Sequence, residues 1–305
     1  ARTVVDQARV YEIRVRAYAM QSKLTAALQA GLKGLRLLDV GFPSEPGPVH
    51  IQQGMQAMYA LLATQPIETL AALPEMTEPR AQAALLILNG LLPITYRIAP
   101  LLTLLMVFQM VALSARYGNA APSPHAYASL GAALCAVAHD YQTSARLGRL
   151  AAQMLEHPNT VAFRCRTRTA LHIFLQYWTE PLSATLDGLD EAYHIGLETG
   201  DFEYAGYVLG MHCFYAFYCG RDLSWMEQAL TATEDAYVRY NLGRTFASHR
   251  LYHQVVLNLQ GQAHDPTQLV GTHYDETSMV PQHLAVNNRL TVFRLYLNRA
   301  FLQYV

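Results

Sequence analysis

The chain has 305 residues, of which 52% are hydrophobic and only 15% are charged, and its formal net charge is −1. Soluble domains carry about 25% charged residues, and disordered chains need more charge and fewer apolar groups than this chain has. A near-neutral chain also lacks the positive field that attracts nucleic acid or anionic membranes. The composition therefore predicts a folded protein whose partners are neither nucleic acid nor membrane.

The N-terminal part, residues 1–40, is predicted to form a helical hairpin. Residues 4–19 and 23–38 carry apolar side chains at the three- and four-residue spacing of amphipathic helices. Ala27 and Gly34 lie beside the apolar stripe of the second helix. Because both residues are small, we expect another helix to approach closely there.

Residues 41–80 are predicted to form an irregular linker, since they contain six of the 14 prolines of the chain. A short helix is expected within this linker at 51–63. The remaining residues, 81–305, are assigned to one main helical array.

One segment of that array, 98–115, is apolar enough to cross a membrane, although 18 residues is near the lower limit for a span. The alternative, which we favour, is a helix covered on all sides in a large helical protein. The preceding apolar stretch, 81–94, contains Asn89, Gly90 and Pro93 and is expected to be too short to form a membrane hairpin with it.

Pairs of helices recur along the main array. The predicted pairs are 124–138 with 141–155, 160–178 with 182–199, and 202–219 with 223–240, followed by a helix at 243–259, a loop at 261–277 and an apolar helix that reaches residue 305. The pairs start about 35 to 40 residues apart, a period typical of helical repeats. No strand signal accompanies them. The predicted fold is all-α, a superhelical array of antiparallel helical hairpins similar to a tetratricopeptide solenoid, in which helices covered on two sides need few charges.

The cysteines and the chain ends bear on the context of the protein. The chain has four cysteines, Cys135, Cys165, Cys213 and Cys219. None of them forms a C-x-x-C pair, and all lie in apolar, helix-like stretches. This pattern predicts reduced, buried thiols and a cytoplasmic location. The sequence does not start with Met, and its last predicted helix has no stop signal. We therefore expect a piece of a longer protein.

Aromatic residues concentrated in the predicted pair 202–240 are the strongest binding candidates. Tyrosine combines apolar area with a hydroxyl group, which suits a binding surface, and solenoids bind partners on their concave face. Core packing between hairpins is the favoured interpretation for much of the group, and a peptide or ligand groove is the alternative. The candidate partner- or ligand-binding residues are Tyr204, Tyr207, Tyr215, Tyr218 and Trp225.

A small basic cluster adds two candidates. Arg164 and Arg168 share a face of a predicted helix, with Arg166 between them, and together they can clamp a phosphate or a carboxylate. A solvated helix start is the simpler interpretation.

Histidines supply the only pattern suggestive of a metal. His249 and His253 have the i, i+4 spacing of two ligands on one helix face, and His264 and His273 follow in the loop. His249 is not followed by the Glu of an H-E-x-x-H motif. We interpret the pair as ordinary histidines on a half-exposed face and predict no metal, no cofactor and no catalytic residue.

Several segments resemble the helical region of very large bacterial signalling proteins. The segments, at 11–43, 73–79, 116–131, 196–207 and 274–300, read YEIRVRAYAMQSKLTAALQAGLKGLRLLDVGFP, LPEMTEP, RYGNAAPSPHAYASLG, GLETGDFEYAGY, and YDETSMVPQH with AVNNR and YLNRA. In that family a protein-kinase-like domain precedes an AAA-type STAND ATPase, which is followed by tetratricopeptide-like repeats, GAF modules, and a histidine kinase or nucleotide cyclase. None of these segments is a catalytic signature, and the chain contains no G-x-x-x-x-G-K-[ST] loop.

The resemblance implies a non-catalytic scaffold or sensor region that couples an ATPase module to a histidine-kinase output module. Its partners would be those protein modules or a peptide ligand. The alternative is a peptide- or small-molecule-binding regulatory domain of a STAND-type transcription activator. A third class, a metal-dependent hydrolase, depends on His249 and His253 alone.

Overall fold

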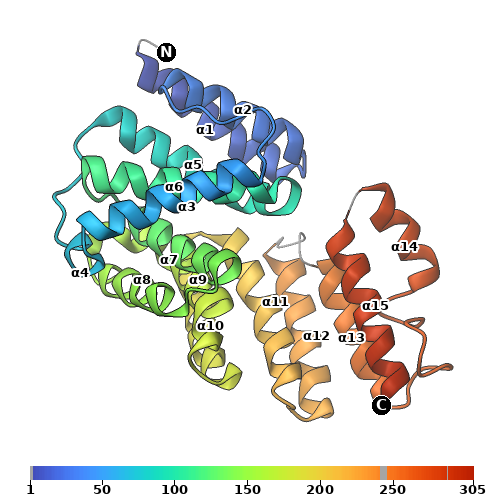
Figure 1. Cartoon of the computed structure of the whole chain (residues 1–305). Coiled ribbons are helices and arrows are strands. Elements are labelled where there is room, and N and C mark those ends of the chain that lie inside the picture. The colour runs from blue at the N-terminus through green and yellow to red at the C-terminus, as the bar shows by residue number, and fades with distance from the viewer. Residues whose placement is uncertain (1–2, 241–245, 287) are drawn as a thin grey trace. The chain divides into compact units, whose positions relative to one another are not determined.

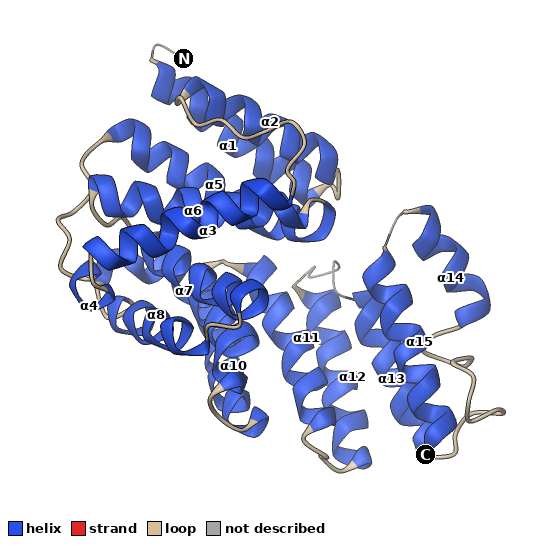
Figure 2. Ribbon diagram, in the orientation of Figure 1, coloured by secondary structure: helices blue, strands red, loops and turns tan. Residues whose placement is uncertain are grey.

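The computed structural model describes residues 3–240, 246–286 and 288–305 and divides into two compact units, Ala1–Thr179 and Glu180–Val305. In the described part of the chain the regular secondary structure is helical, with two isolated β-bridges, Glu75 with Asn119 and Val270 with Asp275. Figure 2 shows helices joined by loops throughout these residues. The predicted all-α class is confirmed.

The first unit contains α1 (Val4–Met20), α2 (Leu24–Leu37), α3 (Pro48–Thr64), α4 (Ile67–Leu70), α5 (Pro79–Ile98), α6 (Pro100–Tyr117), α7 (Ser123–Ala133), α8 (Tyr141–Met154) and α9 (Arg164–Ala170). The second unit contains α10 (Thr185–Thr199), α11 (Phe202–Tyr218), α12 (Leu223–Arg239), α13 (Phe246–Leu259), α14 (Glu276–Ala285) and α15 (Arg289–Tyr304). The predicted boundaries at residues 40 and 80 fall inside the first unit, and the two units separate after Thr179.

Helices α1 and α2 pack against each other and against α5 (Figure 1). A capping box starts α1, in which Thr3 Oγ1 accepts from the Asp6 backbone N–H and the Asp6 carboxylate accepts from that of Thr3, each at 3.1 Å. A Cβ atom at Gly31 would lie 2.6 Å from Leu91 of α5, and one at Gly34 would lie 2.8 Å from the Tyr11 Cβ of α1. The close approach expected at Gly34 is therefore present, and Gly31 permits a second one.

Helix α5 corrects one prediction. The stretch 81–94 was expected to be short because of Asn89, Gly90 and Pro93, yet α5 runs for 20 residues and continues through Pro93. Tight packing overrides the local cost of an internal proline, since the helix is buried along most of its length against α1, α2 and α6.

Both α5 and α6 are long and apolar enough to cross a membrane by length and composition. Within the chain, 61% of the most apolar window of α5 and 44% of that of α6 is buried. Helix α6 contains residues 100–115 of the predicted segment 98–115, whereas Ile98 ends α5. It packs against α3, α5 and α7, so the interior of the first unit accounts for much of its apolar character. Solvent reaches some of it, as at Leu101, so α6 is not covered on all sides.

The proline-rich stretch 41–80 contains α3, which begins at a proline in its first turn and covers the helix predicted at 51–63. Its Gly54 lies against Phe108 of α6, where a Cβ atom would collide with the ring. The remainder is fixed by the bridge between Glu75 and Asn119, at which the Asn119 side chain also donates to the Leu70 carbonyl at 2.7 Å.

The helix predicted at 160–178 is broken into short segments. A 3₁₀ turn at Pro158–Phe163 precedes α9, and a π-helical turn at Leu171–Leu175 and a 3₁₀ turn at Gln176–Trp178 follow it. Helix α9 packs against α7 and α8. The apolar period alone does not register these changes of helix type, because each shifts the hydrogen-bond pattern by only one residue.

In the second unit α10, α11 and α12 each pack against the next helix along the chain, and α13 packs against α15 (Figure 1). The chain turns between α10 and α11 at Gly200, whose φ of 74° is in the left-handed region that glycine tolerates. Asp222 caps α12 by accepting from the backbone of Ser224 and Trp225. Asp275 caps α14, because its carboxylate accepts from the Thr277 backbone N–H at 2.9 Å.

The cysteines are free thiols: Cys135, Cys165 and Cys213 are buried, and Cys219 is half-buried. Burial raises the pKa of the Cys213 thiol to about 11, which keeps it protonated at neutral pH. The prediction of reduced, buried thiols is confirmed for three of the four cysteines.

Candidate functional site

Two of the aromatic candidates are core residues. Tyr204 and Tyr215 on α11 are each only 6% exposed. Tyr204 also makes an edge-to-face contact with Tyr207, with ring centroids 5.6 Å apart. The favoured interpretation, packing between helices, describes these two tyrosines.

The other three aromatic candidates reach the surface to different extents. Tyr207 is half-buried, and its hydroxyl donates to the Glu203 carboxylate at 2.9 Å. Tyr218 is 47% exposed and Trp225 is 40% exposed, with the Arg221 guanidinium 5.5 Å from the Trp225 ring. Only this part of the predicted group is available to a partner.

An aromatic network joins α11 to α13 and α15. The Phe214 ring makes edge-to-face contacts with Tyr218 at 4.8 Å and with Tyr252 of α13 at 5.0 Å. Phe217 contacts Phe301 of α15 in the same geometry at 6.0 Å. The network therefore links half-buried and exposed rings of α11 to α13 and to Phe301 of the last helix.

Helix α15 presents apolar side chains on two sides. Its buried side, at spacings of four, three and four, consists of Thr291, Leu295, Asn298 and Leu302. We name the second side the outer face of α15; it follows spacings of three, four, four and three and consists of Leu290, Phe293, Leu297, Phe301 and Tyr304. These five side chains are 36% to 91% exposed.

The outer face of α15 was missed in the sequence, although its signal is present. A helix with one apolar stripe is expected at a protein surface, whereas a helix that is apolar on both sides is expected between two neighbours. Helix α15 packs against α13 and α14, and the Arg299 guanidinium reaches the Glu276 carboxylate of α14 at 3.2 Å. These contacts use one side of the helix and leave the outer face of α15 exposed, apart from the contact of Phe301 with Phe217 of α11.

The predicted arginine pair is placed on α9, and both of its members are half-buried. The Arg164 Nε atom donates to the Leu155 carbonyl at 3.0 Å, a contact that ends the preceding helix rather than forming an anion clamp. The phosphate or carboxylate clamp of Arg164 and Arg168 stays a prediction.

The intervening arginine, Arg166, points into the first unit. It donates to Asn89 Oδ1 at 2.6 Å, and the Asn89 amide group contacts His125 Nδ1 at 2.9 Å. Because the Asn89 oxygen accepts from Arg166, its NH₂ group donates and His125 Nδ1 accepts, which requires a neutral imidazole. Burial, with a smaller contribution from the Arg166 charge, lowers the pKa of His125 to about 3.

The interpretation of His249 and His253 as residues on a half-exposed face is wrong. They are 4% and 1% exposed, because α13 is covered by α12 on one side and by α11 and α15 elsewhere. His249 Nε2 lies 2.9 Å from the Leu230 carbonyl of α12. Burial lowers the pKa of His249 to about 4, despite the opposing effect of that hydrogen bond.

His253 belongs to a group that sequence spacing did not reveal. Its Nδ1 atom lies 2.8 Å from Glu234 Oε1 of α12, and His273 Nδ1 lies 3.0 Å from the same oxygen. The two imidazole rings face each other with centroids 3.6 Å apart. His249 is not part of this group, and His264 is exposed.

The Glu234 carboxylate is ionised in this setting. Burial raises its pKa, but the hydrogen bonds and charges of His253 and His273 outweigh burial, so the pKa lies below its usual value. The carboxylate therefore carries its negative charge throughout the neutral range.

The loop that carries His273 is fixed by buried amides of α13. Asn258 Nδ2 donates to the Pro266 carbonyl at 3.0 Å and to the Gln268 carbonyl at 2.7 Å. Gln254 donates to Asn258 and accepts from the His273 backbone N–H at 3.2 Å. These bonds hold a long connection in one conformation, against the usual tendency of such loops to vary.

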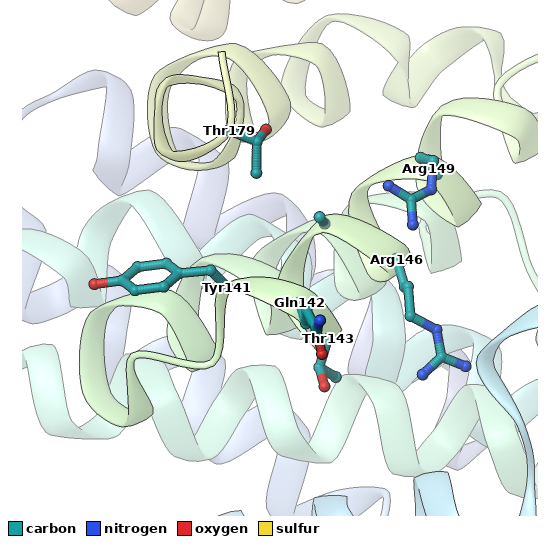
Figure 3. Close-up of a pocket in the computed structure, with 7 residues that line it drawn as sticks. Tyr141, Gln142, Thr143, Arg146, Arg149 and Thr179 are labelled. Atoms are coloured by element: carbon teal, nitrogen blue, oxygen red, sulfur yellow. The ribbon is translucent and has the colours of Figure 1, made fainter.

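A shallow hollow of about 490 Å³ lies beside α8 in the first unit (Figure 3). Its lining includes Tyr141, Arg146, Arg149 and Thr179. Arg146 is already bound by two hydrogen bonds, at 2.8 and 2.9 Å, to the Glu68 carboxylate. The hollow thus lacks the convergent polar groups of a specific ligand pocket.

Comparison of the sequence with family models and with curated proteins finds no match.

Proposed function

We propose that this chain is a non-catalytic helical-repeat scaffold or sensor region that couples an ATPase module to a histidine-kinase output module in a large bacterial signal-transduction protein. In this proposal the helices form a superhelical array of antiparallel hairpins, similar to a tetratricopeptide solenoid, in the cytoplasm. The resemblance of five segments supports the proposal. The packing of helices against their neighbours in chain order, as in α1 with α2 and α10 with α11, is also consistent with it.

The observation that carries the proposal is the outer face of α15. Apolar side chains in a continuous row cost free energy in water, about 25 cal/mol for each Å² of apolar surface left exposed, and such rows mark protein contacts. Spacings of three and four match the grooves of another helix. The occupant in this proposal is therefore a helix of a neighbouring module.

Coupling requires two arrangements of the joined modules. A ligand or partner shifts the balance between them only when it binds one arrangement more tightly than the other. A helix docked on the outer face of α15 in one arrangement and released in the other would supply that difference.

A photo-crosslinking amino acid at position 293, in the protein as its gene encodes it, tests the proposal. We expect crosslinks to an ATPase, GAF or kinase module, and none from position 13, where Ile13 is 66% exposed on α1. Equal crosslinking from both positions, or none from position 293, would count against a docked helix.

The alternative, a peptide- or small-molecule-binding regulatory domain of a STAND-type transcription activator, is favoured by one observation, the exposed aromatic rings of Tyr218 and Trp225. The encoded sequence beyond Val305 distinguishes the two. GAF and kinase modules there support the scaffold, and a DNA-binding helix-turn-helix supports the activator.

A further inference from the structure

The side-chain group of Glu234, His253 and His273 has the composition of a transition-metal site. Two imidazole nitrogens and one carboxylate oxygen are ligands that Zn²⁺ and related first-row divalent ions accept. The three residues come from α12, α13 and the loop before α14, and their ligand atoms all lie within 4.8 Å of one another.

Two of the three distances between ligand atoms need little change to accept an ion. Donor atoms bound to one tetrahedral zinc at about 2.0–2.1 Å lie roughly 3.3–3.4 Å apart. The two imidazole Nδ1 atoms lie 2.8 and 3.0 Å from Glu234 Oε1, so each separation has to grow by only a few tenths of an ångström. Small rotations of the side chains provide that movement.

Burial and access are both suited to ion binding. The His253 side chain is 1% exposed and that of Glu234 is 18% exposed, which fixes two ligands in the interior. The His273 side chain is 28% exposed, so an ion can enter from its side and keep a water as a fourth ligand.

The surroundings hold the third ligand in place. Gln254, which is 1% exposed, accepts from the His273 backbone N–H. A Cβ atom at Gly271 would collide with the end of the Gln254 side chain, which glycine leaves in place to bond to the His273 backbone. Such supporting contacts keep ligands oriented in metal sites.

We infer that Glu234, His253 and His273 bind one divalent transition-metal ion of the zinc class, which joins α12 and α13 to the loop at 260–275. This inference is independent of the proposed scaffold function, because it depends on contacts within the second unit alone.

Zinc binding to the untagged, metal-free full-length chain tests the inference by calorimetry and by elemental analysis after dialysis. We expect one Zn²⁺ per chain. At a free zinc concentration 100-fold above the Kd, we also expect a rise in Tm of about 5 °C or more. X-ray absorption of the zinc-loaded protein should show imidazole ligands at about 2.0–2.1 Å.

The variants His273→Ala and Glu234→Gln should each weaken binding at least 10-fold, as loss of a zinc ligand does. His264→Ala, an exposed histidine of the same loop, is the matched control and should bind as the wild type does. Circular dichroism shows whether each variant is folded.

Absence of stoichiometric zinc in the wild-type chain would overturn the inference, whatever the variants do. So would zinc that His264→Ala loses while His273→Ala and Glu234→Gln retain it, or a zinc spectrum without imidazole ligands. If a ligand variant fails to fold, the wild-type stoichiometry and spectrum decide the question.

Discussion

The two units satisfy their buried polar groups in different ways. In the first unit most of these groups are hydroxyls that bond to a carbonyl of their own helix, as Thr95 does to Leu91 at 3.1 Å and Thr169 to Cys165 at 2.8 Å. In the second unit they include imidazoles and amides that reach other elements, as His249 reaches Leu230 and Asn258 reaches the loop at 260–275.

This difference concerns how the elements of each unit are joined. A hydroxyl bonded within its own turn constrains nothing beyond that turn. Imidazoles and amides bonded between elements specify how those elements are joined. The first unit contains one such network, in which Asn89 of α5 bonds to Arg166 and contacts His125, and in the second unit such bonds also hold the loop at 260–275.

The largest expected effect is in the apolar core of the first unit. Leu88→Ala should lower the free energy of unfolding by about 2–5 kcal/mol, because Leu88 is fully buried on α5 and its removal leaves a cavity. Urea unfolding of the full chain measures this change. Ile13→Ala, at an exposed position of α1, is the control and should change the free energy of unfolding by no more than about 0.5 kcal/mol. Equal losses of stability in the two variants would show that the core around Leu88 is not close-packed.

Acid should destabilise both units through their buried histidines. The folded pKa values, about 3 for His125 and about 4 for His249, lie below the unfolded value near 6.5, so the unfolded chain binds more protons as pH falls below about 6.5. Stability is therefore greatest above that pH and decreases below it. Between pH 6.5 and 5 each of the two histidines should lower the free energy of unfolding by up to about 2 kcal/mol.

Urea unfolding at a series of pH values measures this dependence. His125→Gln and His249→Gln should each flatten the slope between pH 6.5 and 5, while His194→Gln, whose side chain is 63% exposed, should not. A slope unchanged in both buried variants would show that these histidines are protonated in the folded chain. The pKa of Glu234 is lowered in the folded chain, so protonation of Glu234 should decrease the free energy of unfolding only below about pH 4.5.

The two kinds of polar group should differ when they are removed. Asn258→Ala leaves the carbonyls of Pro266 and Gln268 without their donor, which should cost about 1–3 kcal/mol. It should also speed amide hydrogen exchange over 260–275. Thr95→Val removes a hydroxyl bonded within one helix and should cost below about 1 kcal/mol. The contrast drawn between the units fails if the two costs are alike.

The smallest effect on stability is expected at the outer face of α15. Phe293→Ser should change the free energy of unfolding by less than about 0.5 kcal/mol, because the side chain is 63% exposed. Leu295→Ser, two residues away on the buried side, should cost about 2–5 kcal/mol. Thermal unfolding compares them, and a large loss for Phe293→Ser would show that its ring packs within the chain.

Much of the local structure could be predicted from the sequence. The bounds of α1, α2, α8, α11 and α12 agree with the apolar spacing to within one or two residues. The cap at Asp275 depends on a local bond, in which its carboxylate accepts from the backbone N–H two residues away, so the residue type and its position before the helix are enough to indicate it. These features depend on residues close together in the chain.

Other features could not be predicted in this way. Continuation of α5 through Pro93 depends on the helices packed around it, and the breaks at 158–178 depend on hydrogen bonds that apolar spacing does not record. His249 and His253 share a face by spacing, yet they bond to different residues of α12.

The sequence by itself determined that this protein is helical, where five of its helices begin and end, and that a neighbouring helix approaches α2 closely at Gly34. Only the tertiary structure decided which histidine meets Glu234, since His253 and His273 lie 19 and 39 residues from it. The same holds for which side of α15 is covered, because apolar side chains lie on both sides, and the buried side also contains the polar Thr291 and Asn298. Helix formation depends on neighbours within a turn or two, whereas the candidate sites depend on contacts between elements far apart in the chain.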